Sequence, residues 1–333
     1  MFAKELGIDL GSANTAVVVR RRGIVAREPS VVAIDRYTRE VVAVGTRARH
    51  MIGRTPDSIL PVQPVRGGVI CDLDRTTALL RHMIRQIAHS RWLRPRLVLT
   101  APTGISDVER RALLDAAVQA GAGEIHLIDE AVAAALGAEL PVHQAIGSLV
   151  VDIGGGTAKA AVLSLRAVVI SATVPIAGDT MDEAIIRHVR REHNLFIGTP
   201  TAERVKEQLG SAVPPADART LVSGRKVANG LPAAVELSAH DIHAALREPL
   251  AHLDALLLGL LERTPPELLA DISRSGIVLT GGVAQMAGLA ERLTRLTGLA
   301  VRTADAPADA VARGTTRALE SPRQVRLVSG RGR

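Results

Sequence analysis

The sequence predicts an α/β fold of two related domains, because it contains one pattern twice and mixes short strands with helices throughout. Near the start, an apolar segment ends at Asp9, and a turn containing Gly11 leads into a second apolar segment. The same pattern recurs at Asp152 and Gly154, so that both the aspartates and the glycines are 143 residues apart. A repeat of so long a period indicates two domains that face each other rather than a solenoid.

Length and composition agree with two globular domains. A chain of 333 residues is long enough to bury two cores, and it is 47% hydrophobic and 23% charged. Aromatic residues make up only 1%, so the cores must consist of aliphatic side chains. Cys71 is the single cysteine, and neither a signal peptide nor an apolar run long enough to cross a membrane is apparent. We therefore expect a cytoplasmic protein.

The net charge of +7 suggests an anionic partner, such as a nucleotide, a nucleic acid or a membrane surface. Nucleic acid is the weakest of these choices, since few aromatic side chains are available to stack on bases. We expect no nucleic-acid partner. Part of the charge lies in residues 321–333, which we expect to form a basic and disordered tail.

The first half of the chain begins with apolar strands and continues with helices. One helix has clear boundaries, because Ser106 and Glu109 form a capping box and Gly121 ends the pattern. Strands are expected at residues 6–10, 15–20, 30–34, 41–44, 96–101 and 124–128, and further helices at 75–88 and 129–138. We expect domain I to span residues 1–142, with a small inserted subdomain at about 29–64.

The second half repeats this order. Asp179 can cap one helix, and Pro249 is expected to interrupt another, whereas residues 214–230 are polar and are expected to form a loop. Strands are expected at residues 148–153, 158–165, 167–174 and 276–280, and helices at 181–191, 202–209, 241–263 and 287–296. We expect domain II to span residues 143–320, with an inserted subdomain at about 179–261.

The two repeated turns are candidate phosphate-binding hairpins. Each offers backbone N–H groups and a carboxylate at one place, a combination that holds phosphates and their magnesium ion. A single Asp-x-Gly is usually a plain β-turn, but two aligned copies favour a nucleotide site. Asp9 and Asp152 would contact Mg²⁺ through water or act as a base toward an attacking water. Two such hairpins that hold one nucleotide are the layout of actin-like ATPases.

Three further groups are candidates, each with a simpler structural alternative. Glu130 begins a helix, where it either favours the helix dipole or orients a hydrolytic water. Glu203 and Lys206 share a helix face and either contact a ligand or form a solvated ion pair. Gly281 and Gly282 follow a strand and either form a tight turn or admit a flat base or ribose.

Trp92 and Leu93 form an apolar pair between two arginines, a pattern suited to shallow insertion into an anionic bilayer. The alternative is a loop whose tryptophan packs on the core. The ten histidines show no convincing metal site: His240 and His243 share a helix face but have no third ligand of clear spacing.

The motifs together resemble the MreB/Mbl family of bacterial actin homologues that determine rod shape. The resemblance extends from Asp9 to about Glu320. It is carried by residues 9–15, 28–34, 53–56, 102–105, 108–111, 152–157, 177–179, 181–185, 263–268 and 276–282.

The resemblance implies an actin-like fold, shared with heat-shock chaperone ATPases and sugar kinases, that holds ATP and Mg²⁺ between its halves. It implies a slow ATPase coupled to self-assembly into filaments on the inner face of the cell membrane, where membrane proteins of the cell-wall elongation machinery are partners. Glu130 and Asp152 are then catalytic, Trp92 and Leu93 insert into the membrane, and Asp9 and Asp152 hold Mg²⁺ through water. The implied nucleotide-binding residues are Asp9, Gly11, Ser12, Ala13, Asn14, Asp152, Gly154, Gly155, Gly156, Thr157, Glu203, Lys206, Gly281, Gly282 and Val283.

Four positions depart from the family pattern. Ala131 stands where proline is usual, Ala158 and Lys159 where threonine and glutamate are usual, and Val283 where a third glycine is usual. Three of these changes, at Ala158, Lys159 and Val283, motivate one alternative, a nucleotide-binding adaptor that does not polymerise. The fold alone leaves open a second, a small-molecule kinase of the same superfold.

Overall fold

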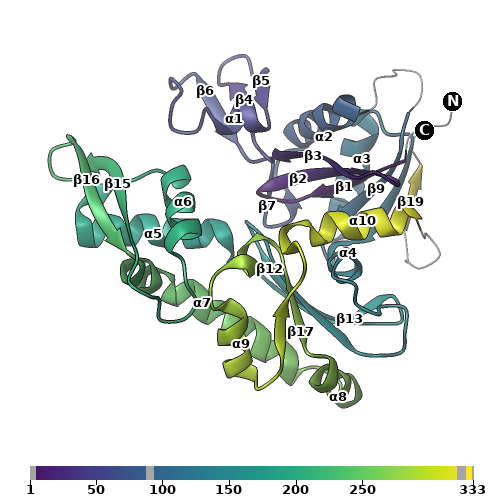
Figure 1. Cartoon of the computed structure of the whole chain (residues 1–333). Helices are drawn as coiled ribbons and strands as arrows, with labels where there is room; N and C mark the ends of the chain where they lie inside the picture. The colour runs from purple at the N-terminus through teal and green to yellow at the C-terminus, as the bar shows by residue number, and fades with distance from the viewer. Residues whose placement is uncertain (1–4, 88–93, 321–327, 332–333) are drawn as a thin grey trace.

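The computed structural model describes residues 5–87, 94–320 and 328–331, and its two largest sheets have the same strand order (Figure 1). In the first sheet the order is β3-β2-β1-β9-β10, extended by β19, and in the second it is β13-β12-β11-β17-β18. In both, three antiparallel strands precede two parallel ones. The first sheet contains β1 (Glu5–Leu10), β2 (Asn14–Val19), β3 (Gly23–Pro29), β9 (Arg96–Ala101), β10 (Glu124–Asp129) and β19 (Val328–Arg331). The second contains β11 (Ser148–Ile153), β12 (Ala158–Ser164), β13 (Ala167–Val174), β17 (Ile277–Thr280) and β18 (Val301–Thr303).

Helices cover the outer face of each sheet with aliphatic side chains. Leu79 and Met83 of α2 (Leu73–Ile87) join Leu113 of α3 (Asp107–Ala120) in the core of the first sheet. The second core contains Met181 and Leu250 and is the larger of the two. Its helices are α5 (Gly178–His193), α6 (Thr199–Leu209), α7 (Ala239–Glu262), α8 (Pro266–Ser275) and α9 (Leu289–Thr297).

Two helices that pack against each other lie between the large sheets, and the first of them contacts strands of both sheets. They are α4 (Glu130–Gly137) and α10 (Ala310–Glu320), and their core includes Val98 of the first sheet and Val150 of the second. Two glycines permit this close packing. A Cβ atom on Gly137 would lie 1.7 Å from the carbonyl oxygen of Ala310, and one on Gly314 would lie 1.9 Å from that of Ala133.

Smaller sheets extend from each half and lie at the same end of the molecule (Figure 1). The first is β5-β4-β6 beside the short helix α1, and the second is β14-β15-β16 beside α5 and α6. Their elements are β4 (Val32–Asp35), β5 (Val41–Val44), α1 (Thr46–Arg49), β6 (Ile59–Val62), β14 (Leu195–Phe196), β15 (Arg219–Lys226) and β16 (Pro232–Ser238). The remaining elements are β7 (Val65–Arg66), β8 (Val69–Ile70), η1 (Gly282–Gln285) and η2 (Pro307–Asp309).

The prediction of irregular structure was wrong in two segments, because backbone hydrogen bonding between strands outweighs their polar composition. Within residues 321–333, expected to be disordered, residues 328–331 form strand β19, which pairs with the otherwise open edge of β10. Within residues 214–230, expected to be a loop, β15 pairs with β16 as a hairpin with one exposed face.

The predicted interruption of one helix and the predicted cap of another were also wrong. Helix α7 continues through Pro249 without interruption, since the buried faces of Leu246 and Leu250 hold both halves against the core. Asp179 is not a cap: α5 begins at Gly178, and Asp179 lies in its first turn. The predicted capping box at Ser106 is confirmed, because its side chain accepts from the Glu109 N–H and the Glu109 carboxylate accepts from the Ser106 N–H.

Candidate functional site

The two repeated hairpins have the same internal geometry and touch each other at their tips. The Gly11 N–H donates to the Asn14 carbonyl at 3.1 Å, and the Gly154 N–H donates to the Thr157 carbonyl at 3.0 Å. A Cβ atom on Gly155 would lie 2.5 Å from the Cβ atom of Ala13. The hairpins of the two halves therefore meet at one place, and glycine at residue 155 is what allows them to do so.

Gly155→Ala is expected to weaken nucleotide binding at least about tenfold, because the added methyl group would separate the two hairpin tips that would together surround the phosphates. The measurement is titration of the full chain with a fluorescent ATP analogue. Gly259→Ala in α7 is the matched control, since a Cβ atom there meets nothing within 4 Å. Equal affinities of the two variants would contradict the prediction.

Three carboxylates converge beside the hairpins, and burial together with their mutual repulsion raises the pKa values of two of them. Burial, and then the charges of Glu130 and Asp152, raise the pKa of Asp9 to about 8. Burial and Glu130 raise the pKa of Asp152 to about 6, against the opposing effects of Thr280 and Lys159. Buried carboxylates that repel one another form a site that favours a cation, so the donors present fit a magnesium ion.

Two threonines orient the aspartates, and the sequence analysis did not identify them. Thr100 at the end of β9 donates to Asp9 over 3.4 Å, and Thr280 at the end of β17 donates to Asp152 over 2.7 Å. Because β9 and β17 occupy equivalent places in the two sheets, this support is repeated in both halves. The signal that could have revealed them is that both threonines lie at the end of a predicted apolar strand, 96–101 and 276–280.

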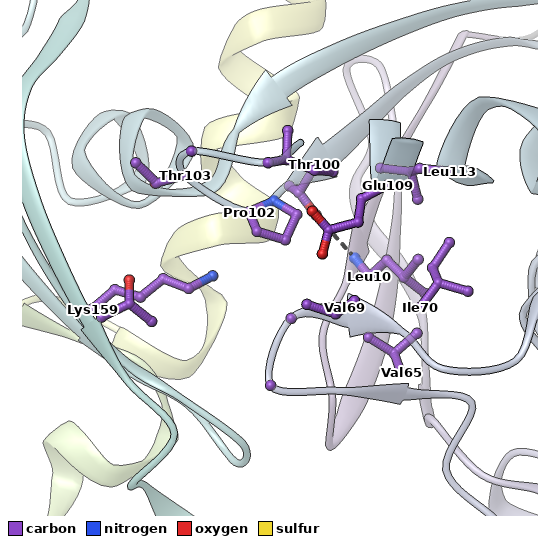
Figure 2. Close-up of a pocket in the computed structure, with 15 residues that line it drawn as sticks. Leu10, Val65, Val69, Ile70, Thr100, Pro102, Thr103, Glu109, Leu113 and Lys159 are labelled. Atoms are coloured by element: carbon purple, nitrogen blue, oxygen red, sulfur yellow. Dashed lines mark hydrogen bonds between the residues drawn. The ribbon is translucent and has the colours of Figure 1, made fainter. Parts of the chain in front are cut away.

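Lys159 brings a positive charge into this acidic group. Its cross-strand neighbour is Asp152, and its ammonium group forms an ion pair with the Glu130 carboxylate. The Lys159 side chain is only 4% exposed. It extends from β12 toward a cavity of about 180 Å³ that is lined by Pro102 and Val69 (Figure 2). Glu130 is therefore paired with a cation rather than free in the cleft.

Ala131 has a local role that proline could not fill. The Ala131 N–H donates to the carboxylate of Asp129 at 2.8 Å, and this carboxylate is the N-cap of α4. The hydroxyl of Thr103 donates to the same carboxylate oxygen at 2.7 Å. Since proline has no N–H, alanine at this position adds a capping hydrogen bond next to Glu130.

The second hairpin is tied to the N-terminus of α5. The N–H groups of Gly178 and Asp179 donate to the carbonyls of Gly154 and Gly155 at 3.1 and 2.8 Å. Movement of this hairpin would thus be transmitted along α5 to the small subdomain.

Glu203 and Lys206 do not pair with each other, so the solvated ion pair that was the simpler alternative is not formed. Lys206 binds the Asp182 carboxylate at 2.8 Å and the Gly178 carbonyl at 2.9 Å, so it supports the first turn of α5. Burial raises the pKa of Asp182 to about 6 although Lys206 opposes the shift. Glu203 instead forms an ion pair with Arg49 of α1, which joins the two small subdomains across the cleft.

The glycine pair after β17 has two different environments. Gly281 has a φ of +86°, and a Cβ atom there would lie 2.2 Å from the Ile153 carbonyl oxygen, beside Asp152. A Cβ atom on Gly282 would meet nothing within 4 Å, so its backbone faces open space. Val283 is buried in the second core and presents its side chain there.

Trp92 and Leu93 lie outside the described residues. Within the described part of the chain, no helix combines the length and the apolar character needed to cross a bilayer.

Two duplicated halves, with paired glycine hairpins and acidic strand ends between them, define an actin-like protein. The family model for the MreB/Mbl protein matches residues 3–327. The chain belongs to the MreB/Mbl family.

Individual relatives agree over almost the whole chain. The cell shape-determining protein MreB of Escherichia coli K12 is 47% identical over 327 residues, which cover 96% of this chain and 94% of the relative. The cell shape-determining protein Mbl of Bacillus subtilis 168 is 40% identical over 317 residues, 95% of each chain. MreB 5 of Spiroplasma citri bound to AMPPNP has a TM-score of 0.92 at 33% identity, covering 97% of this chain and 98% of the other.

Proposed function

We propose that this protein binds ATP and Mg²⁺ between its two halves and assembles into membrane-associated filaments that guide peptidoglycan synthesis and so determine cell shape. The contact between the two equivalent hairpins is the observation that carries the proposal, because it brings the turns of both halves together at one place. The cell-shape relatives and the AMPPNP complex of the Spiroplasma citri protein support it.

Each site residue has a proposed role. The hairpin N–H groups bind phosphate oxygens, and Asp9 and Asp152 hold the magnesium ion through water. A bound magnesium ion would neutralise phosphate charge. Glu130 orients the attacking water when it is released from Lys159, and Asp152 accepts a proton from it. Glu203 and the open backbone of Gly282 would flank the adenosine.

Filaments would make weak membrane binding effective. A single Trp92–Leu93 pair inserts little apolar surface, but many copies on one filament bind together with high avidity. This requires the Trp92–Leu93 pair to face the same way in every subunit.

The test is co-sedimentation of the full chain with anionic liposomes, with ATP or ADP, while phosphate release is followed in the same sample. We expect pelleting that depends on ATP, slow phosphate release, and loss of liposome binding in Trp92→Ala. ATP binding without pelleting or release would instead favour the non-polymerising adaptor. The ion pair between Lys159 and Glu130 is the observation that keeps this second candidate open.

Arg49→Ala is expected to tighten ATP binding about twofold to fivefold. The pair between Arg49 and Glu203 is partly exposed, so breaking it when ATP binds costs no more than ~1 kcal/mol of binding free energy, and the variant avoids that cost. Glu203 would then be free to accept from the ribose. Arg47→Ala in the same helix is the control, because Arg47 is exposed and is not paired in the described structure. Weaker ATP binding in Arg49→Ala than in Arg47→Ala would refute this role.

A further inference from the structure

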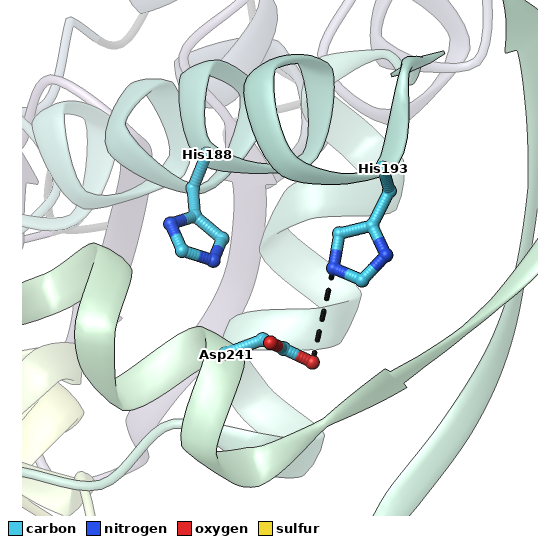
Figure 3. A group of neighbouring side chains, drawn as sticks. All are labelled: His188, His193 and Asp241. Carbon is cyan, nitrogen blue, oxygen red and sulfur yellow. Dashed lines mark ion pairs between the residues drawn. The ribbon is translucent and has the colours of Figure 1, made fainter.

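Two histidines and a carboxylate converge in the small subdomain of the second half, far along α5 from the hairpins. His188 and His193 lie near the C-terminal end of α5, and Asp241 lies in the first turn of α7 (Figure 3). One ligand atom from each residue lies within 4.8 Å of those of the other two. The distance from His193 Nε2 to Asp241 Oδ2 is 3.8 Å.

Both imidazoles have an unused nitrogen at this point. The Nε2 atoms of His188 and His193 are buried, and neither has a hydrogen-bond partner within the described chain. The 3.8 Å separation between His193 and Asp241 is too long for a hydrogen bond. Buried polar atoms nearly always have a hydrogen-bond partner, so two nitrogens that lack one beside a carboxylate favour a bound ligand at this point.

The Asp241 carboxylate is already oriented for a metal ion. It accepts hydrogen bonds from the backbone N–H and the hydroxyl of Ser238. These bonds, at 2.9 and 2.7 Å, fix the carboxylate in position. The nearby Arg191 is paired with Glu192, which reduces its repulsion of a cation.

We propose that His188, His193 and Asp241 bind a zinc-like transition-metal ion, with water as the fourth ligand. Two imidazole nitrogens and one carboxylate are a donor set that zinc accepts, whereas magnesium prefers oxygen alone. The ion would link the end of α5 to the start of α7 and stiffen the subdomain that carries Glu203.

The sequence did not predict this site, and its histidines showed no convincing metal spacing. The two histidines are five residues apart, and Asp241 follows His193 by 48 residues. Only the packing of α7 against α5 brings the three together.

The experiment uses the full chain, freed of metal with a chelator and kept without nucleotide and without magnesium. Co²⁺ is titrated while its visible absorption is followed, and Zn²⁺ is then added as a competitor. We expect one ion per chain, displacement of Co²⁺ by Zn²⁺, and a melting temperature that rises with Zn²⁺ concentration. His188→Gln and His193→Gln are each expected to weaken binding about 100-fold or more. His240→Gln, an exposed residue of α7, is the matched control and is expected to bind as the unaltered chain does.

A second measurement does not depend on the stability of the variants. Imidazole NMR signals of the unaltered chain are recorded during Zn²⁺ addition, and we expect two of the ten histidines to shift together at one equivalent. A specific site is expected to bind Zn²⁺ with a dissociation constant on the order of a hundred times below 100 µM. Absence of binding at 100 µM Zn²⁺ would therefore overturn the proposal. Binding that both variants retain, or shifts spread over exposed histidines, would overturn it as well.

Discussion

Lys159→Ala is expected to accelerate phosphate release from ATP about tenfold or more. In the unaltered chain, the Lys159 ammonium group is paired with Glu130, the carboxylate proposed to orient the attacking water. A carboxylate engaged by a buried cation is held in place, so it cannot act freely on water. Since general acid–base groups contribute about 10²–10⁴-fold, even partial release of Glu130 gives a measurable gain.

The same change is expected to destabilise the protein when magnesium is absent. Removing one partner of a buried ion pair costs about 3–5 kcal/mol, and here it also leaves three carboxylates without their internal cation. Added Mg²⁺ with ATP should recover most of this loss. A melting temperature that falls without magnesium and recovers with it would show that Lys159 supplies a charge that the ion can replace.

Two variants separate this explanation from a general loosening of the cleft. Lys159→Arg keeps the cation and is expected to hydrolyse ATP as slowly as the unaltered chain. Adding Glu130→Ala to Lys159→Ala is expected to abolish the gain. Slower phosphate release in Lys159→Ala would mean that the lysine assists hydrolysis, and the blocking role would have to be abandoned.

The fold was largely predictable because its signals are local. Apolar runs ending in Asp9 and Asp152 predict strands, and the capping box at Ser106 predicts a helix start, without knowledge of distant residues. The errors occurred where distant pairing decides the structure. Strand β19 forms because β10 has an open edge, and α7 passes through Pro249 because both its halves are packed.

The candidate site was predictable in its residue types but not in their pairings. Glu130 was identified by its place at a helix start, Glu203 by helical spacing and Lys159 by its departure from the family pattern. Nothing in the sequence indicates that Lys159 binds Glu130 or that Arg49 reaches Glu203. Arg49 and Glu203 are 154 residues apart, and their contact depends on how the two halves face each other. Pair contacts of this kind come from tertiary packing, which a single sequence does not display.

The stability of the nucleotide-free protein is expected to fall as pH rises from about 4 to about 8. Burial and the neighbouring charges of Glu130 and Asp152 raise the pKa of Asp9 to about 8 in the folded state, against an ordinary value of 3.8. The folded state therefore holds this proton more tightly than the unfolded chain does across that interval. The free energy of unfolding therefore falls by up to ~1.4 kcal/mol per pH unit as pH rises. The fall is complete above the pKa that Asp9 has in the folded protein.

Asp9→Asn is expected to remove this dependence, because asparagine keeps the shape of the side chain and carries no charge. At pH 8, without magnesium or nucleotide, the variant should be more stable than the unaltered chain by about 2 kcal/mol or more. The measurement is urea unfolding at several pH values, with Asp57→Asn, an exposed aspartate, as the control. Parallel stability curves for the unaltered chain and Asp9→Asn would contradict the assignment.

Magnesium provides the independent half of this test. A divalent ion binds the ionised form of Asp9 and competes with its proton, so apparent magnesium affinity in the presence of ATP should increase with pH up to about 8. In Asp9→Asn the increase should be weaker, since the Asp9 carboxylate no longer titrates while Asp152, whose pKa is about 6, remains in the site. The cluster of acids would thus be unstable by itself above neutral pH and would be stabilised by the magnesium ion proposed to bind there, which would link nucleotide loading to the rigidity of the cleft.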